Sequence, residues 1–410
     1  MFGRQTSALT EETRVSTYYA VFFLAIGSVM PFVAIWFESI GISASMSGLI
    51  LAAPPFAIVL FNIIIGSAAD RLKDWRSAII GCNIIALVVG AWLLFRVEPV
   101  HVLVVWTISG LFVIASSPIT DAAALDMTRR RGSDYARIRA LGSVGFVVGI
   151  VLAGALFDKI GMGSFAWIIL LTAALRLLAA YLLPTFRERP QSEHQAVIPD
   201  DEKTSINQRL FGGLMAGMAL FRQPGISSVI FGAALLNASH SFNNVYSVLH
   251  WGQLGISNTV SSLLWSAGVV AEIALMWGFT GIAKRVSARH CLLLACFICT
   301  VRWLITGMDP SVWVLFVLQT LHAITFGLTF LASVNFISRR VDADHAAQAQ
   351  SVLATLTTLF MAIGIWLSGQ FYQTFGGQTY WAMAIMALLG GALVLNSYRT
   401  KLIDVAAEYR

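Results

Sequence analysis

Charged side chains are rare inside the long apolar stretches of this 410-residue sequence, and the few present indicate its chemistry. Asp121 and Arg139 stand on neighbouring stretches, so their carboxylate and guanidinium can pair with each other or with a bound solute. Arg139 would anchor an anionic solute, because its forked guanidinium matches a carboxylate. Phe146, seven residues further on the same helical face, would give apolar cover. The alternative is a salt bridge that only fixes two helices.

A second set of charges lies in the later apolar stretches. Glu272 and Arg302 fall on two consecutive stretches, with His240 and His322 as titratable neighbours. Glu272 is the one carboxylate that the sequence places inside an apolar stretch of this part. These residues indicate either exchange of protons or, in the alternative, a glutamate that only neutralises Arg302.

Polar and aromatic residues recur at helical spacing close to these charges. His240, Asn243 and Asn244 would form one polar face, and Trp265 with Glu272 would form another. We expect His240, Asn243 and Trp265 to contact the solute, since a tryptophan ring suits a flat molecule. The alternative for Trp265 is packing, the more frequent role of aromatic residues in membrane helices.

The elements that hold these residues are predicted from composition. The chain is 57% hydrophobic and 12% charged, with a mean hydropathy of +0.76. A helix that spans a bilayer needs about 20 mostly apolar residues. The sequence offers twelve such windows: 15–37, 45–68, 77–95, 101–124, 137–158, 163–184, 225–250, 257–280, 288–307, 311–335, 346–372 and 378–397. We therefore predict an all-α membrane protein with twelve transmembrane helices.

The basic residues predict the orientation. Of the 27 Lys and Arg, all but Arg96, Lys159, Arg176 and Arg302 lie at the termini or in the even-to-odd connections. Arg176 is expected to extend its head toward the cytoplasmic surface. By the positive-inside rule both termini are cytoplasmic. The net charge of +6 is then a topology signal, and no nucleic-acid partner is expected.

The longest hydrophilic stretch divides six windows from six. We predict an N-terminal half at 1–184, a cytoplasmic linker at 185–223 and a C-terminal half at 224–410. Ser205 and Gln208 have the spacing of a capping box before an amphipathic segment, which predicts an interfacial helix in the linker.

The two halves share a short repeat. Glu38-Ser-Ile-Gly-Ile-Ser43 precedes the second window, and Gly252-Gln-Leu-Gly-Ile-Ser257 precedes the eighth, an offset of 214 residues. Duplicated six-helix units are the plan of many secondary transporters.

Several motifs resemble the major facilitator superfamily. Gly66-Ser-Ala-Ala-Asp70-Arg71 resembles part of its loop signature after the second helix, although Lys73-Asp-Trp75 departs from the pattern. The resemblance implies that Gly66, Asp70 and Arg71 belong to a gating loop.

Longer segments resemble one branch of that superfamily. Pro118-Ile-Thr-Asp121 and Tyr135-Ala-Arg-Ile-Arg139 are similar to segments of the lactose and phenylpropionate permeases. Leu264-Trp-Ser-Ala-Gly-Val-Val-Ala-Glu272 and Gln319-Thr-Leu-His322 look most like the phenylpropionate permeases. The resemblance covers essentially all the predicted helices and implies the twelve-helix fold.

The resemblance also implies roles for the charged residues. In lactose permease the carboxylate and arginine that match Asp121 and Arg139 hold the sugar, and the residues that match Arg302 and His322 belong to the proton-coupling cluster. This chain has Thr325 and Gln319 where that cluster has a carboxylate and a lysine. Proton coupling would then need another acid, and Glu272 is the candidate.

Other classes of function are excluded by what the sequence lacks. It has no phosphate-binding loop, nucleophile motif or metal-ligand spacing, so we expect neither an enzyme nor a metal site. Cys82, Cys291, Cys296 and Cys299 lie in apolar stretches and are expected to be buried free thiols. Without a nucleotide site, the energy source would be the proton gradient, with no cofactor.

Together these patterns predict a secondary active transporter, a multi-pass monomer in the bacterial inner membrane. We expect it to import a small organic solute together with protons, and most plausibly an aromatic or other monocarboxylate. The alternatives are a proton symporter for a sugar or nucleoside, and a membrane sensor with a transporter fold that transports nothing.

Overall fold

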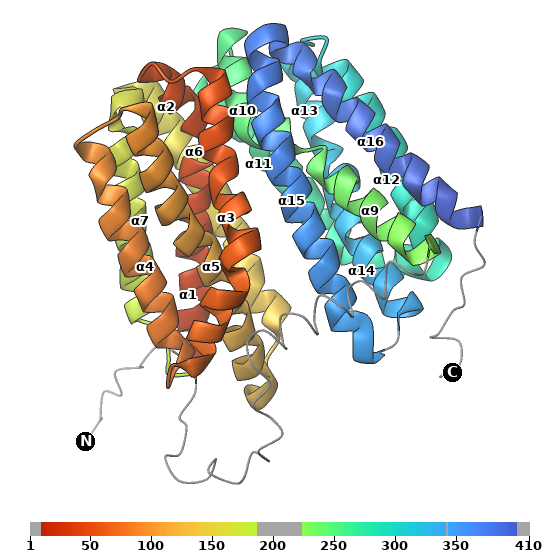
Figure 1. Cartoon of the computed structure of the whole chain (residues 1–410), viewed down its shortest axis with the longest axis horizontal. Helices are drawn as coiled ribbons and strands as arrows, with labels where there is room; N and C mark the ends of the chain where they lie inside the picture. The colour runs from red at the N-terminus through yellow and green to blue at the C-terminus, as the bar shows by residue number, and fades with distance from the viewer. Residues whose placement is uncertain (1–9, 187–223, 342, 400–410) are drawn as a thin grey trace, which may run out of the picture. The chain divides into compact units, whose positions relative to one another are not determined.

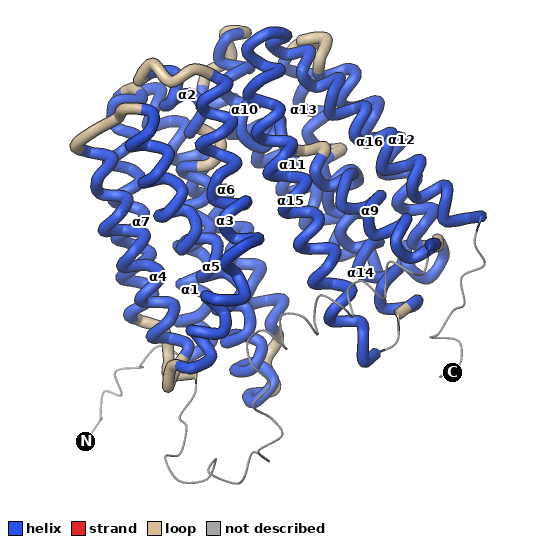
Figure 2. The backbone as a smooth tube through the Cα atoms, in the orientation of Figure 1, coloured by secondary structure: helices blue, strands red, loops and turns tan. Residues whose placement is uncertain are grey.

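The computed structural model of the chain describes residues 10–186, 224–341 and 343–399. Every regular element in these ranges is a helix, and the connections between helices are short (Figures 1 and 2). The helices group into two compact units. Residues 1–42, 53–189 and 257–263 form the first, and residues 43–52, 190–256 and 264–410 form the second. The predicted linker helix after Ser205 lies outside the described residues.

Most of the first unit comes from the N-terminal part of the chain. Its elements are α1 (Glu11–Val29), α2 (Val33–Ser39), α3 (Ala44–Arg71), α4 (Trp75–Gly90), η1 (Ala91–Leu94), α5 (Pro99–Arg131), α6 (Tyr135–Ile160), η2 (Met162–Ser164) and α7 (Phe165–Tyr181). The second unit contains α9 (Pro224–Ala238), α10 (Ser241–Gln253), α11 (Asn258–Arg285), α12 (Ala288–Thr306), α13 (Val312–Thr320), η4 (Ala323–Leu328), α14 (Thr329–Arg340), α15 (Ala343–Phe375), η5 (Gly376–Gln378), α16 (Thr379–Asn396) and η6 (Ser397–Arg399).

Local sequence signals account for several helix ends. The Asp134 carboxylate accepts a hydrogen bond from the Ala136 backbone N–H at 2.8 Å, which caps α6. Ser287 caps α12 in the same way through the His290 N–H. The chain turns out of α5 at Gly132, whose φ of +67° suits glycine.

Three windows that the sequence predicts as continuous helices are interrupted. Window 15–37 splits into α1 and α2, bent by 40° next to Pro31, which has no backbone N–H to donate. Window 225–250 breaks at Ser239–His240, and window 311–335 contains the π-helical turn η4. Hydropathy does not reveal such breaks, because an average over about 20 residues is insensitive to the few residues at a break.

Length and composition make nine of the described helical segments suitable for crossing a membrane, or ten if the bent pair counts as one span. Large apolar side chains on these helices point outward, and Trp277 is 84% exposed and Trp313 76% exposed. A water-soluble protein rarely shows so much apolar surface, whereas a helix in lipid requires it. The four cysteines are buried and free, as predicted.

Glycines permit the close packing of α1 against α6. A Cβ at Gly145 would overlap the carbonyl of Ala20, and a Cβ at Gly149 would overlap that of Leu24. Small residues let membrane helices approach in this way. The contact fixes Tyr19 and Arg139, which lie on these two helices, close to each other.

Each repeated hexapeptide leads into a helix whose first residues belong to a different unit from the rest of that helix. Residues 43–52 at the start of α3 belong to the second unit, and residues 257–263 at the start of α11 belong to the first. In the first unit, the Asp158 carboxylate accepts hydrogen bonds from the Asn258 and Thr259 backbone N–H groups at 3.0 and 2.9 Å. In the second, Ser45 donates to Gln370 at 2.7 Å. The two halves therefore share both the hexapeptide and the way in which the helix start after it packs.

Candidate functional site

In the first unit, two tyrosines hold the carboxylate of Asp121. The hydroxyl groups of Tyr19 on α1 and Tyr135 on α6 donate to its Oδ1 at 2.6 and 2.9 Å. Both donors are neutral hydroxyl groups, and their hydrogen bonds fix the position of the carboxylate. Its other oxygen, Oδ2, accepts no hydrogen bond from the described residues.

Arg139 lies beside this carboxylate but does not pair with it. Its guanidinium carbon lies 4.1 Å above the Phe23 ring and 5.4 Å from the Tyr19 ring. No carboxylate among the described residues is within ion-pair distance of Arg139, and its N–H groups donate no hydrogen bond to them. The expected direct pairing with Asp121 is therefore absent. Phe146, two turns along α6, is half-buried.

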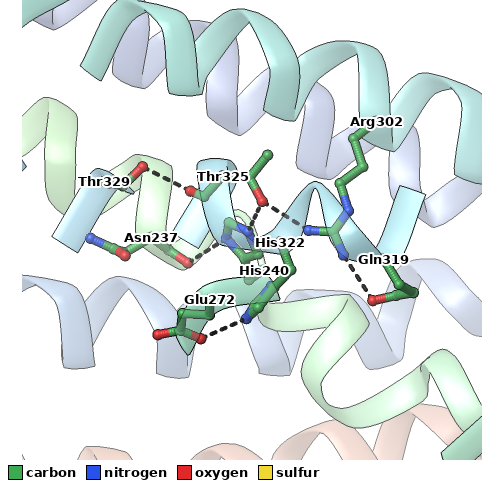
Figure 3. Close-up of polar contacts among 8 residues, drawn as sticks. All are labelled: Asn237, His240, Glu272, Arg302, Gln319, His322, Thr325 and Thr329. Atoms are coloured by element: carbon green, nitrogen blue, oxygen red, sulfur yellow. Dashed lines mark hydrogen bonds and ion pairs between the residues drawn. The ribbon is translucent and has the colours of Figure 1, made fainter. Parts of the chain in front are cut away.

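In the second unit, Arg302 is fully buried and bound by neutral groups (Figure 3). Its guanidinium donates to the Thr325 hydroxyl at 2.8 Å and to the Gln319 amide oxygen at 3.0 Å. These are the two positions that depart from the lactose permease pattern. Glu272 is not among its partners, so the structure does not support the view that Glu272 only neutralises Arg302.

His240 extends this network. Its Nδ1 lies 3.1 Å from the Asn237 carbonyl oxygen, and its Nε2 lies 3.0 Å from the Thr325 hydroxyl. A carbonyl only accepts hydrogen bonds, so Nδ1 carries a proton. In the neutral ring Nε2 then accepts from Thr325, whose oxygen in turn accepts from Arg302. One hydroxyl thus connects the histidine with the guanidinium.

Glu272 and His322 lie next to each other at the edge of the cluster (Figure 3). The Glu272 carboxylate oxygen is 3.7 Å from His322 Nε2, and both side chains are largely buried. Two glycines allow this approach. A Cβ at Gly268 would lie 3.1 Å from the Gln319 carbonyl oxygen, and one at Gly327 would lie 3.0 Å from Glu272 Cγ.

The π-helical turn η4 contains Thr325 and begins directly after His322. π-Helical turns are frequent at functional sites. His322 stacks on Phe326 with ring centroids 5.0 Å apart, and the His240 ring lies 5.5 Å away. The second unit therefore brings Glu272, His322, His240 and Arg302 into one buried cluster. Within this cluster Arg302 is held by neutral partners.

Two predicted solute contacts take part in bonds between helices. The Asn243 amide oxygen accepts from the Tyr380 hydroxyl at 3.2 Å. Trp265 Nε1 donates to the Ser247 hydroxyl at 3.1 Å, and the Trp265 side chain is half-buried. Both residues lie in the second unit with His240.

The predicted gating residues lie in the last two turns of α3 and not in a loop, because this helix continues to Arg71. Asp70 accepts a hydrogen bond from Trp75 Nε1 at 3.1 Å, and Arg71 is the last residue of α3. A Cβ at Gly66 would have no neighbour within 4 Å, so packing of the described residues does not require glycine there.

The prediction for Arg176 is wrong. Its side chain does not extend to the surface but is 5% exposed, and its Nε donates to the Asn83 amide oxygen at 2.5 Å. Asn83 in turn donates to the Tyr18 hydroxyl at 3.0 Å. Polar partners inside the helix bundle replace the water that a snorkelling arginine would need.

Comparison with known proteins shows which family the chain belongs to. Residues 12–383 match the MFS_1 like family, which is most of the 410 residues. The chain belongs to the major facilitator superfamily. It is accordingly a multi-pass membrane transporter for a small-molecule substrate, and not an enzyme.

Relatives of this superfamily member include transporters for several solutes. The probable 3-phenylpropionic acid transporter of Escherichia coli strain K12 is 30% identical over 383 residues, which cover 90% of this chain and 93% of that protein. The maltose permease of Geobacillus stearothermophilus is 25% identical over 372 residues, which cover 90% of this chain and 88% of that permease.

Solved structures share the superfamily fold. The nucleoside transporter NupG aligns with a TM-score of 0.78 at 15% identity, over 96% of this chain and 100% of that chain. A bacterial homologue of the human lysosomal transporter Spinster, in an inward-facing and unoccupied conformation, aligns with a TM-score of 0.71 at 16% identity, over 95% of this chain and 96% of that chain. At these identities the likeness is one of fold.

Sequence reasoning missed several residues that organise the transporter's polar clusters. Tyr19 and Phe23 hold Asp121 and Arg139, and Asn237 fixes the His240 ring. A hydroxyl group alone does not single out Tyr19, because Ser16, Thr17, Tyr18 and Ser28 lie in the same window. No group of three or more His, Cys, Asp or Glu side chains in the described residues is arranged to hold a metal ion.

Proposed function

We propose that this transporter imports a small organic monocarboxylate together with protons, and that an aromatic acid resembling 3-phenylpropionate is the first candidate. The proton gradient would supply the energy, without a cofactor. The proposal includes a monomer with twelve spanning helices in the bacterial inner membrane and both termini in the cytoplasm. Its halves would be residues 1–184 and 224–410, joined by a cytoplasmic linker at 185–223.

The twelve-span topology is supported by the correspondence between windows and helices. Each predicted window overlaps one helix or one interrupted helix, including the short pair α9 and α10. A span that breaks in the membrane is acceptable where protein covers its exposed backbone groups. The basic connections α5–α6 and α11–α12 then lie on the cytoplasmic side.

The observation that supports a carboxylate substrate most strongly is the state of Arg139. Its guanidinium rests on Phe23, donates no hydrogen bond to the described residues and has no acidic partner among them. A carboxylate accepts two parallel bonds from such a fork. The aromatic ring below it suits the flat part of an aromatic acid. The relative named as a probable 3-phenylpropionic acid transporter supports the same class.

Proton coupling is supported by the separation of Glu272 from Arg302. Because Thr325 and Gln319 bind the guanidinium, the carboxyl group can take up and release a proton without unpairing a buried cation. His322 at 3.7 Å is the nearest titratable neighbour and can receive or supply that proton.

A second candidate is a proton symporter for a neutral sugar or nucleoside. Oδ2 of Asp121 is an unused acceptor that suits a hydroxyl group, and the maltose permease relative supports this class. The same residues would bind either solute. The Asp121 carboxylate would contribute most of the binding energy for a sugar, and the Arg139 guanidinium would contribute most of it for an acid.

Counterflow in proteoliposomes tests the proposal. Liposomes that contain the purified protein are preloaded with unlabelled 3-phenylpropionate, maltose or a nucleoside, and uptake of the labelled solute is followed. Because undissociated acids cross bilayers unaided, protein-free liposomes provide the baseline. We expect counterflow above this baseline for the acid. Counterflow only with maltose or a nucleoside would favour the second candidate, and binding without exchange of any solute would indicate a sensor.

A further inference from the structure

A cavity of about 100 Å³ lies in the second unit, where α11 turns into α12 and α14 ends. Its polar walls come from Ser287 and Arg289 at the start of α12, and from Asn335, Arg339 and Arg340 near the end of α14. One water occupies about 30 Å³, so the space exceeds that of a single water molecule. None of the transport residues discussed above lines it.

The chemistry of the walls favours a phosphate group. Three arginines, one amide and one hydroxyl surround the space, and none of the described residues that line it is acidic. Arginine forks bind phosphate oxygens through paired hydrogen bonds. The first backbone N–H groups of the 19-residue helix α12 also lie at this wall and favour an anion.

Arg289 and Arg339 keep their charge without an acidic partner. Arg289 donates to the Ser397 carbonyl at 3.3 Å, and its guanidinium carbon lies 4.0 Å above the Tyr398 ring. Both partners are neutral, so these contacts orient the fork without pairing its charge. Within the described part of the chain, no carboxylate lies within ion-pair distance of either arginine.

In the first unit, arginines at the end of a helix pair with carboxylates of the same unit. In the first unit, Asp74 caps α4, the helix that follows α3 as α12 follows α11. Arg131 at the end of α5 pairs with Glu11 at 2.8 Å, and Arg130 pairs with Asp126 at 3.1 Å. In the second unit the corresponding cap is the neutral Ser287. Arg130 and Arg131 of the first unit thus have acidic partners, whereas Arg289 and Arg339 have none among the described residues.

We propose that the cavity formed by Ser287, Arg289, Asn335, Arg339 and Arg340 binds a phosphate group. The headgroup of an anionic phospholipid and a phosphate in solution offer the same chemistry to these walls. Both basic segments are predicted to lie at the cytoplasmic surface, where either source is present. The site is separate from the residues proposed for transport.

The test uses the purified, delipidated full-length protein in detergent. Native mass spectrometry measures retention of dioleoylphosphatidylglycerol, with dioleoylphosphatidylcholine as the zwitterionic comparison, and calorimetry measures binding of inorganic phosphate. Arg339→Gln removes a wall charge without breaking a hydrogen bond to a described residue. Arg285→Gln is the matched control, since Arg285 is exposed at the end of α11 but does not line the cavity.

We expect Arg339→Gln to weaken binding of the anionic probe about tenfold, the effect of losing one charge-assisted bond, and Arg285→Gln to leave it unchanged. A loss confined to phosphatidylglycerol identifies a lipid headgroup as the source, and a loss confined to inorganic phosphate identifies a soluble one. Arg339→Lys, which keeps the charge, and the melting temperature of each variant separate lost binding from lost folding. Absence of binding by the parent, or equal losses in Arg339→Gln and Arg285→Gln, would overturn the proposal.

Discussion

The guanidinium of Arg302 donates a hydrogen bond to the Thr325 hydroxyl at 2.8 Å, and the same hydroxyl lies 3.0 Å from His240 Nε2. All three side chains are fully buried. A buried cation normally needs a carboxylate, and here a threonine and a glutamine take that place. Glu272, the carboxylate of this cluster, is therefore not needed as a partner of Arg302.

Thr325→Val should destabilise the protein by about 1–3 kcal/mol, because it leaves donors and acceptors of Arg302 and His240 without a partner in the core. Thermal unfolding in detergent measures the effect. Thr329→Val is the matched control, since the equally buried Thr329 hydroxyl bonds only the Thr325 carbonyl of its own helix. Equal losses in the two variants would show that the connection between Arg302 and His240 contributes nothing to stability.

Arg139→Lys should lose most of the affinity for a carboxylate solute while the protein still folds. Lysine keeps the charge but presents no fork to a carboxylate and stacks less well on Phe23. Ligand-induced thermal stabilisation gives the affinity. Arg137→Lys serves as the control, because the side chain of Arg137 is 88% exposed and pairs only with Asp134. Parental binding by Arg139→Lys would exclude the anchoring role.

Asp121→Asn separates the two solute classes. For a sugar or nucleoside, loss of the anionic acceptor should weaken binding strongly. For a carboxylate the same change removes a repulsive charge, so binding should be kept or improved. Binding of both kinds of solute is measured for Asp121→Asn. The control is Asp126→Asn, which removes a carboxylate from the same helix. Strong loss of acid binding in Asp121→Asn would contradict a monocarboxylate as the substrate.

Asp158→Ala should lower the stability of the first unit by about 0.5–2 kcal/mol, the usual effect of removing a helix cap. The change leaves the Asn258 and Thr259 backbone N–H groups without their acceptor. The melting temperature of Lys159→Ala, at the exposed neighbouring position, is the reference. A melting temperature for Asp158→Ala equal to that of Lys159→Ala would mean that solvent replaces the cap at no cost.

Hydropathy and charge made the helical class and the approximate helix ranges predictable, because apolar windows of about 20 residues have few alternatives. The sequence also located Asp121, Arg139, Glu272, Arg302 and His322, since a charge among apolar residues stands out. Their partners could not be predicted in the same way. Whether Arg302 meets Glu272 or Thr325 depends on helix rotation and on the π-helical turn, and hydropathy is insensitive to both. The snorkelling predicted for Arg176 failed because Asn83 on another helix supplies an acceptor.

The proton-carrying role proposed for Glu272 has consequences for two transport modes. Uphill uptake requires the carboxyl group to load and unload a proton in each cycle, while exchange of substrate at equilibrium requires no net proton movement. Glu272→Gln imitates the loaded state at nearly the same volume. Its melting temperature should stay close to that of the parent, because Arg302 keeps its partners Thr325 and Gln319.

Uptake of labelled 3-phenylpropionate into proteoliposomes under an imposed pH gradient, alkaline inside, tests the central claim most directly. Accumulation in protein-free liposomes under the same gradient is subtracted, because the undissociated acid also crosses lipid unaided. We predict that the parent accumulates the solute above this baseline and that Glu272→Gln does not, although Glu272→Gln retains counterflow. Accumulation by Glu272→Gln at the parental rate, or none by the parent, would contradict proton-coupled import through Glu272.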